Sequence, residues 1–434
     1  MAGSFARILK NRVVIVKTKT LAKIPKKRYV FKSDCRACGG KKFQEIIDLG
    51  EMPLANAFLT KDRLADKELC APLTVYFCKS CALVQLRHVV DPKILFKDYH
   101  YQTSASAPLV LHFKKLAQEI MAKHIKSKND LVVEIGSNDG SLLENIKTSC
   151  RVLGIDPAPG MAEIAKSKGV PTLTAFFNET AAEKILKSHG PAKVIIANNV
   201  LAHIDDLASV FEGINKLLNP TGVFIFEAHW VGNLIGKGGF DQIYHEHLCY
   251  FSLYTINKLA SKFDLKILDV SLEKIHGQSI RVTLGKIGTP KKSVARTLAK
   301  EKKLGLQTAR VFKTFAQKVK KNKRALVSLL QKLKRGNKKI VGYGATAKGN
   351  TLLNYCGIKQ ETLDFITDTT VLKQNLFTPG THIPIVPPEK LNEIIPDYIL
   401  LLSWNYAEEI LKKESALRKR GVKFIIPVPR VKVI

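Results

Sequence analysis

At 434 residues, the chain is too long for one ordinary hydrophobic core, and its length predicts two or three domains. Hydrophobic residues make up 45% of the sequence, which is enough for globular packing along most of its length. No apolar run reaches the roughly 18 residues of a membrane-spanning helix, and the N-terminus lacks the apolar segment of a secretory signal. We therefore expect a cytoplasmic protein without a membrane span.

The net charge of +33 is concentrated in two regions. Residues 1–33 contain ten Lys and Arg and no acid, and residues 291–339 contain 18 Lys and Arg against one acid, Glu301. Such regions attract polyanions such as RNA. Aromatic side chains that could stack on bases are sparse among them, which favours solvated faces of a lysine-rich protein instead. Nucleic acid is therefore a possible partner, but not the favoured one.

A basic extension at 1–33 is followed by a predicted zinc-binding module at 34–90. The module contains two CxxC pairs, at Cys35 and Cys38 and at Cys78 and Cys81. Two such turns supply the four thiolates of a tetrahedral Zn²⁺ site, and a closed shell of this kind indicates a structural metal. A redox-active CxxC is the alternative, but it normally begins a helix after a strand, and neither pair has that context.

Residues 91–290 are predicted to form an α/β domain with a mainly parallel sheet. Apolar segments with the length and composition of strands alternate with helical patterns. Four of these segments are LVVEIGS, VLGID, KVIIANN and GVFIFEA, and DLKILDVSLEKI and SIRVTLGKI are expected to pair and close the domain.

The first of these strands ends in E-x-G-x-N-x-G, formed by Glu134, Gly136 and Asn138 with Gly140. This turn resembles the S-adenosylmethionine (SAM) turn of class I methyltransferases. Asp156 ends the next strand, where an acid can accept both ribose hydroxyls of a cofactor. Turn and acid together predict a cofactor that contains ribose. NAD is the competitor of SAM, and the missing GxGxxG fingerprint weighs against it.

Asn198 and Asn199 end the third strand, at the edge where open α/β sheets bind ligands, so we expect both to contact the cofactor. His203 follows four residues later, where a lone histidine is more often a surface or capping residue. Residues 291–336 are predicted to form a basic helical connector, and residues 337–434 a second α/β domain. Its glycine turn, GYGATAKGNT, can present backbone N–H groups to a phosphate. The alternative for that turn is a purely structural strand-to-helix connection.

The segment YHEHLCYFS at 244–252 places Tyr244, His245, Glu246 and His247 in a row. From spacing alone, a catalytic acid–base cluster and a polar strand edge are about equally consistent with it. In an extended strand, side chains alternate between the two faces. Tyr244, Glu246 and His247 can therefore converge only if the chain bends there.

These motifs, taken together, resemble the SAM-dependent C-methyltransferases that act on nucleotide-linked 4-keto sugars. The resemblance runs from about Cys35 to about Pro427. It rests on the four cysteines with LGEMPLANAFL, and on YHYQTSAS, EIGSNDGSLL, NNVLAHIDD, YHEHLCYFS, IHGQSIRV, YGATAKGNTLLNYCGI and PGTHIPI. Asn375 departs from the pattern, because a glycine is usual at its position.

The resemblance implies methyl transfer to a carbon, C3, next to the C4 ketone of the sugar. It assigns His247 as the base that removes the C3 proton, with Glu246 assisting. Tyr244 and Tyr101 map into the same site, and His203 maps to a histidine near the C4 oxygen. The C-terminal domain would help to hold the nucleotide sugar, with Lys348 and Asn350 as candidate contacts.

Two other functions remain open at this point. A methyltransferase of the same fold could act on RNA or another anionic substrate, which the charge favours. A non-catalytic scaffold with a retained cofactor fold is the second alternative, and the intact Gly136, Asp156, Glu246 and His247 weigh against it.

Overall fold

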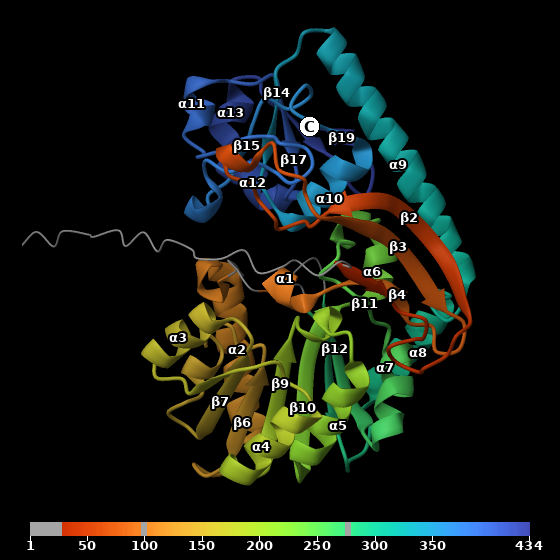
Figure 1. Cartoon of the computed structure of the whole chain (residues 1–434), viewed down its shortest axis with the longest axis vertical. Coiled ribbons are helices and arrows are strands. Elements are labelled where there is room, and N and C mark those ends of the chain that lie inside the picture. Colours follow the sequence, from red (N-terminus) through yellow and green to blue (C-terminus); the bar gives the residue numbers. More distant parts are fainter. Residues whose placement is uncertain (1–27, 97–101, 274–278) are drawn as a thin grey trace, which may run out of the picture.

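The computed structural model describes residues 28–96, 102–273 and 279–434. Within these ranges the chain forms two α/β units and a small antiparallel sheet beside them (Figure 1). The N-terminal module contributes most of the small sheet. The strands of the module are β1 (Tyr29–Phe31), β2 (Phe43–Pro53), β3 (Cys70–Cys78), β4 (Val84–Leu86) and β5 (His88–Val90), followed by helix α1 (Pro92–Phe96). Strands β1 and β5 pair with each other as a separate two-stranded sheet.

The antiparallel sheet has the order β11-β4-β3-β2, and β11 (Cys249–Tyr250) comes from the first α/β unit. Cys249 pairs with Gln85 and Tyr250 with Val84. The strand that follows the YHEH motif is therefore an edge strand of the zinc-module sheet. The motif and the module are consequently held together by backbone hydrogen bonds.

The first α/β unit has a seven-stranded sheet in the order β12-β13-β10-β9-β6-β7-β8, in which β13 is antiparallel to both neighbours. Its strands are β6 (Leu131–Ile135), β7 (Arg151–Asp156), β8 (Thr172–Thr174), β9 (Ala192–Asn198), β10 (Leu218–His229), β12 (Lys266–Glu273) and β13 (Ser279–Gly285). All the strands predicted for this domain are present. Consecutive strands β6 and β7 are neighbours, whereas β9 lies on the other side of β6, so the chain changes direction beside β6. Open α/β sheets bind their ligands at such a point.

Helices cover both faces of this sheet. Residues of α2 and α3 share an apolar core with one face, and residues of α4, α5 and α7 share another core with the opposite face. The helices are α2 (Ala107–His124), α3 (Pro159–Ser167), α4 (Glu179–His189), α5 (Leu207–Leu217), α6 (Val231–Gly236) and α7 (Leu253–Ala260). Every residue of β6 is buried, as expected for a central parallel strand between two helical layers.

The second α/β unit has a six-stranded sheet in the order β16-β15-β14-β17-β18-β19. Its strands are β14 (Ile340–Tyr343), β15 (Ile366–Thr367), β16 (Ile385–Val386), β17 (Tyr398–Leu401), β18 (Lys423–Ile426) and β19 (Lys432–Val433). Its helices are α10 (Ala347–Cys356), α11 (Lys390–Glu393), α12 (Ala407–Lys413) and α13 (Ser415–Lys419). The chain is thus an α/β protein with a zinc module and two Rossmann-like domains, as predicted.

The basic stretch after the first sheet is two helices, not one. Helices α8 (Lys292–Lys303) and α9 (Ala309–Arg335) are separated by a turn in which Gly305 has φ +72°. A left-handed residue at that point ends the first helix. Glu301, the acid of this stretch, is buried and accepts hydrogen bonds from Trp230 Nε1 and from the Leu253 and Tyr254 amides.

Helix α9 packs its apolar side against β2, and Figure 1 shows it along the outer edge of both α/β units. Asn375 adopts φ +67°, a left-handed conformation that asparagine tolerates and that explains why glycine is usual there. Among the helices that the structure describes, none has the length and apolar character required to cross a bilayer.

Candidate functional site

The four knuckle cysteines come together in the N-terminal module. Their sulfur atoms all lie within 4.8 Å of one another, with 3.5 Å between Cys35 and Cys81 and 3.6 Å between Cys38 and Cys78. The Gln85 amide donates to Cys35 Sγ over 3.1 Å. This arrangement fits the tetrahedral thiolate shell of Zn²⁺, and it has no position left for water.

The zinc knuckles are also attached to the first α/β domain. Thr255 Oγ1 donates to the Cys81 carbonyl over 3.0 Å, and Lys262 Nζ donates to the Cys38 carbonyl over 2.9 Å. The buried side chain of Arg36, inside the first knuckle, forms an ion pair with Asp205 at 2.8 Å. Folding of the knuckles around the metal is therefore coupled to their position on that domain.

The first glycine turn lies at the end of β6. Gly136 has φ +67°, and a Cβ there would collide with the Val200 side chain, so only glycine fits. Glu134 Oε2, Ser137 Oγ and Asn199 Oδ1 are buried beside this turn without a hydrogen-bond partner among the described residues. Because buried polar atoms are normally paired, these atoms are available to hydrogen-bond a ligand at this turn.

Glu134 is fully buried in an acidic environment. Burial holds the pKa of its carboxyl well above the usual range, and the nearby Asp156 and Asp139 add to the rise, while Asn198 opposes it. A cation that approached this carboxyl would favour its ionised form. The site is therefore suited to a positively charged ligand group.

Asp156 ends β7 on the same edge of the sheet. Its carboxylate accepts the amide hydrogens of Asn138 over 2.8 Å and Ala158 over 2.9 Å, and burial still raises its pKa. Asn138 has φ +50° and accepts a hydrogen bond from the Thr103 amide over 3.0 Å. The turn, the following strand and the segment after α1 thus meet at one point, with Asn198 at the end of the adjacent β9.

The YHEH segment contains the bend that convergence requires. The His247 amide donates to the Tyr244 carbonyl over 2.9 Å, which closes a turn, and Tyr244 Oη lies 2.8 Å from His247 Nε2. His247 Nδ1 lies 2.8 Å from the Gln242 carbonyl oxygen. Tyr244 and His247 therefore converge. His245 turns the other way, with Nε2 3.0 Å from the Ala71 carbonyl oxygen.

Two further histidines lie against His247. The centroid of the His203 ring is 5.1 Å from that of His247, and the centroid of His229 is 5.0 Å away. Burial lowers the pKa of His203 to about 4, opposed by its contacts with the Glu246 and Asn199 backbone, so its ring is neutral at pH 7. We did not predict His229 from the sequence. It ends β10 at the carboxyl edge of the parallel strands, where open α/β sheets generally bind ligands, and the rule that selected Asn198 would have found it.

Glu246 does not contact His247 through its carboxylate. Asn56 Nδ2 lies 2.8 Å and 2.9 Å from its two oxygens. Burial raises the pKa of Glu246 to about 7, and the hydrogen bond from Asn56 opposes this rise. Asn56 belongs to the LGEMPLANAFL motif, but no spacing rule connects it to a residue so far along the chain.

The remaining candidates lie at the interface with the second α/β domain or beyond the described residues. Lys348 contacts Asn405 Oδ1 and lies 4.8 Å from the Trp404 ring centroid, and burial lowers its pKa to about 8, opposed by Asp241. Asn350 Nδ2 donates to the Ala55 carbonyl over 2.7 Å. Tyr101 is outside the described residues.

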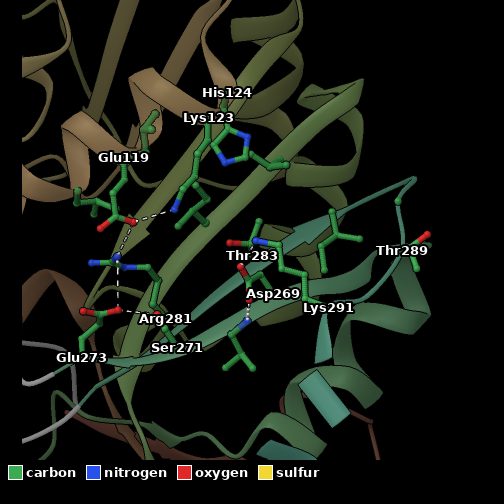
Figure 2. A pocket seen from close by; sticks show the side chains of 17 residues that line it. Glu119, Lys123, His124, Asp269, Ser271, Glu273, Arg281, Thr283, Thr289 and Lys291 are labelled. Carbon is green, nitrogen blue, oxygen red and sulfur yellow. Dashed lines mark hydrogen bonds and ion pairs between the residues drawn. The ribbon is translucent and has the colours of Figure 1, made fainter. Parts of the chain in front are cut away.

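A separate hollow of about 550 Å³ lies between α2, β12 and β13 (Figure 2). Its charged side chains pair with one another, as Arg281 does with Glu119 and Glu273, and Lys291 with Asp269. None of the candidate site residues lines it. Because its acidic and basic side chains already pair with one another, this hollow is not an alternative candidate for the functional site at the strand ends.

Three family models match the chain. They describe a zinc binding domain at residues 35–96, a methyltransferase domain at 111–270 and a C-methyltransferase C-terminal domain at 274–429. C-methyltransferase NovU of Streptomyces niveus is 36% identical over 405 residues, which cover 92% of this chain and 96% of NovU.

More distant similarity is confined to part of the chain. The ubiquinone biosynthesis O-methyltransferase of Colwellia psychrerythraea is 29% identical over 126 residues, or 27% of this chain and 51% of that protein. The structure of magnesium protoporphyrin IX methyltransferase from Synechocystis with bound SAM is 13% identical over 44% of this chain and 88% of its own, and its TM-score of 0.32 is too low to support an assignment. NovU and the three family models carry the conclusion that the chain belongs to the C-methyltransferase family, as a SAM-dependent enzyme with a zinc-binding N-terminal module.

Proposed function

We propose that the enzyme transfers a methyl group from SAM to C3 of a nucleotide-diphosphate-linked 4-keto deoxysugar, through an enolate. The observation that carries this proposal is the state of the His247 ring. The Gln242 carbonyl can only accept a hydrogen bond, so Nδ1 must carry the ring proton. In the neutral ring, Nε2 is then unprotonated and can accept the hydrogen bond of the Tyr244 hydroxyl.

A base in this state suits removal of a proton from carbon. The C4 ketone acidifies the C3 proton, and His247 Nε2 takes that proton while the C3–H electron pair moves into the enolate. The negative charge develops on the C4 oxygen, and the resemblance places His203 near that oxygen. SAM, when bound, supplies an electrophilic methyl group, and its sulfur keeps the electron pair of the broken S–C bond. C3 thereby gains the methyl group, and the C4 ketone is restored.

Tyr244, Tyr101 and Glu246 complete the proposed catalytic group. The Tyr244 hydroxyl is already hydrogen-bonded to Nε2 of His247. The sugar would therefore have to displace this hydroxyl from the nitrogen. Glu246, ionised above about pH 7, would stabilise the imidazolium ion that forms when His247 takes the proton. For Tyr101 only the resemblance of YHYQTSAS to the family motif supports a role.

We assign the cofactor to the edge of the first sheet. Glu134 would face a cationic group of SAM, Asp156 would accept the ribose hydroxyls, and the Gly136 turn would allow close approach of the backbone. Asn138, Asn198 and Asn199 would complete the pocket, and the unpaired Asn199 Oδ1 supports this.

The second α/β domain would hold the nucleotide sugar. Lys348 offers a cation, and Asn350 an unpaired Oδ1, at the start of α10, where helix amides also favour a phosphate. We retain the division into an extension (1–33), a zinc module (34–90), a methyltransferase domain (91–290), a connector (291–336) and a C-terminal domain (337–434). Eight cysteines without a disulfide are consistent with a reducing compartment such as the cytoplasm.

The test is a reaction with ¹³C-methyl SAM and a panel of dTDP- and GDP-linked 4-keto deoxysugars. Mass spectrometry should show a methyl gain, and NMR should place the label on C3. Label on oxygen, or on a carbon other than C3, would contradict the chemistry. RNA offered in parallel should remain unlabelled. Labelled RNA and unlabelled sugars would favour the alternative suggested by the basic charge.

A further inference from the structure

We propose that Asn56, a residue of the N-terminal module, is a positioning residue that sets the ionisation of the Glu246 carboxylate beside the catalytic base. The inference rests on the proposed function, because Glu246 acts there only through His247. It gives the zinc-binding module a part in the chemistry in addition to its structural role.

The contact between Asn56 and Glu246 joins one donor atom to both oxygens of the carboxylate. Asn56 Nδ2 reaches both carboxylate oxygens of Glu246, over 2.8 Å and 2.9 Å. Glu246 is only 5% exposed, and among the described residues its carboxylate has no other hydrogen-bond donor. A buried carboxylate with one donor depends strongly on that donor for its charge.

Among the described residues, the neighbours of Glu246 supply no compensating positive charge. His245 precedes it but directs its ring to the Ala71 carbonyl, and His203 meets the Glu246 backbone, not its carboxylate. Both rings are buried, and burial lowers the pKa of each to about 4, so neither is a cation at neutral pH. His247, the next residue, is the proposed base. Within the part of the chain that the structure describes, Asn56 alone opposes the rise in the pKa of Glu246 that burial causes.

The position of Asn56 is set by other parts of the chain. The carbonyl of Ala55 accepts a hydrogen bond from Asn350 of α10 over 2.7 Å. Leu59 exchanges backbone hydrogen bonds with Phe377, over 3.0 Å and 2.8 Å. The segment that carries Asn56 is thus fixed on both sides by the second α/β domain. These contacts with the second domain place the Asn56 side chain next to Glu246, independently of its own hydrogen bonds to the carboxylate.

The test replaces Asn56 with leucine, which has a similar size, keeps water out and cannot donate. The pKa of Glu246 should rise, so the acidic limb of the kcat profile should move up by about one pH unit. The rate at pH 6 should fall about tenfold, and the rate at pH 9 should stay within about twofold of the wild type. Asn56→Ala should shift the limb less, because water can replace the lost donor. The exposed Asn392 gives the matched control, Asn392→Leu, which should leave the profile unchanged.

A second measurement does not depend on turnover. Carbon-13 NMR of protein labelled at glutamate carboxyls gives the pKa of Glu246 directly, with Glu246→Gln to assign its signal. The pKa should be higher in Asn56→Leu than in the wild type. An unchanged pKa, or a rate lowered equally at all pH values, would overturn the inference. Failure of the wild type to methylate any sugar would refute the proposed function instead, and the NMR result would still decide the role of Asn56.

Discussion

The two glycine turns of this chain have the same backbone arrangement but differ in the side chains that surround them. In the first, Gly136 follows β6, and Asp156 at the end of the next strand accepts two backbone amides. In the second, Gly344 follows β14, and Asp368 after β15 accepts the amides of Ala345 and Thr370, each over 2.7 Å. Both acids therefore first serve to hold their own turn.

The difference lies in what remains beside each turn. The first has Glu134 two residues before its glycine, buried with an unpaired oxygen. The second has Gly342 at that position, and Lys373 Nζ donates to the Ala345 carbonyl over 2.9 Å. Beside the first turn, a buried carboxyl oxygen has no hydrogen-bond partner among the described residues, whereas at the second turn a lysine of the same domain binds the backbone. A strand–glycine–helix turn therefore does not by itself identify a SAM site.

The largest effect should come from the base itself. His247→Asn should lower the rate about 10³-fold, because general-base catalysis typically contributes 10²–10⁴. Calorimetry should find the dissociation constant of SAM within about twofold of the wild type, since the base is not part of the cofactor pocket. His245→Gln is the control in the same turn, because it keeps a donor for the Ala71 carbonyl, and it should retain most of the activity.

The two glycines give the next test. Gly136→Ala adds a Cβ that collides with Val200 at φ +67° and should weaken SAM binding about 100-fold, while Gly344→Ala should leave it unchanged. Gly344→Ala should nevertheless lower the melting temperature, because its Cβ collides with Ser403. Equal loss of SAM binding in both variants would show that the second turn also contributes to the cofactor site.

Substitution of the corresponding acids of the two turns, Asp156 and Asp368, separates a structural role in the turn from a role in ligand binding. Asp156→Asn should weaken SAM binding about tenfold, the usual effect of losing one charged hydrogen-bond acceptor. Asp368→Asn should reduce the free energy of unfolding by about 1–3 kcal/mol through the loss of its two amide contacts, without an effect on SAM. If Asp156→Asn changed stability alone, the ribose assignment would be wrong.

The smallest effect should come from opening the second turn. Lys373→Met removes the hydrogen bond to the Ala345 carbonyl and should cost about 1 kcal/mol in the free energy of unfolding, measured by urea titration. SAM affinity should not change. Binding of a second equivalent of SAM would mean that the lysine alone had kept the cofactor out of that turn.

Continuous apolar runs made six of the seven strands of the first sheet predictable, with β8 missed, and the CxxC spacing made the zinc site predictable. The bend at 244–247 followed from the requirement that Tyr244, Glu246 and His247 converge, but the Glu246 carboxylate contacts Asn56 instead of joining the other two. The break at Gly305 was missed because the amphipathic pattern continues on both sides of it, although LGLQT contains the signal.

Contacts between distant segments were not predictable. The two-residue strand Cys249–Tyr250 pairs with the zinc module only in the folded chain, and Asn56 meets Glu246 from 190 residues away. Propensity and periodicity are local signals, whereas these contacts depend on how three domains pack. His229 was a different kind of miss, since its position at the end of β10 could have been read from the sequence.

The most direct test of the central claim is deuterium uptake at C3 of the keto sugar in D₂O without SAM, followed by mass spectrometry. An enzyme that forms the enolate through His247 should exchange the C3 proton before any methyl group is available. His247→Asn should abolish the exchange, while Gly136→Ala should retain it. Exchange that persists in His247→Asn would assign the base to another residue. Methylation by the wild type without any exchange would contradict an enolate that forms independently of the methyl donor.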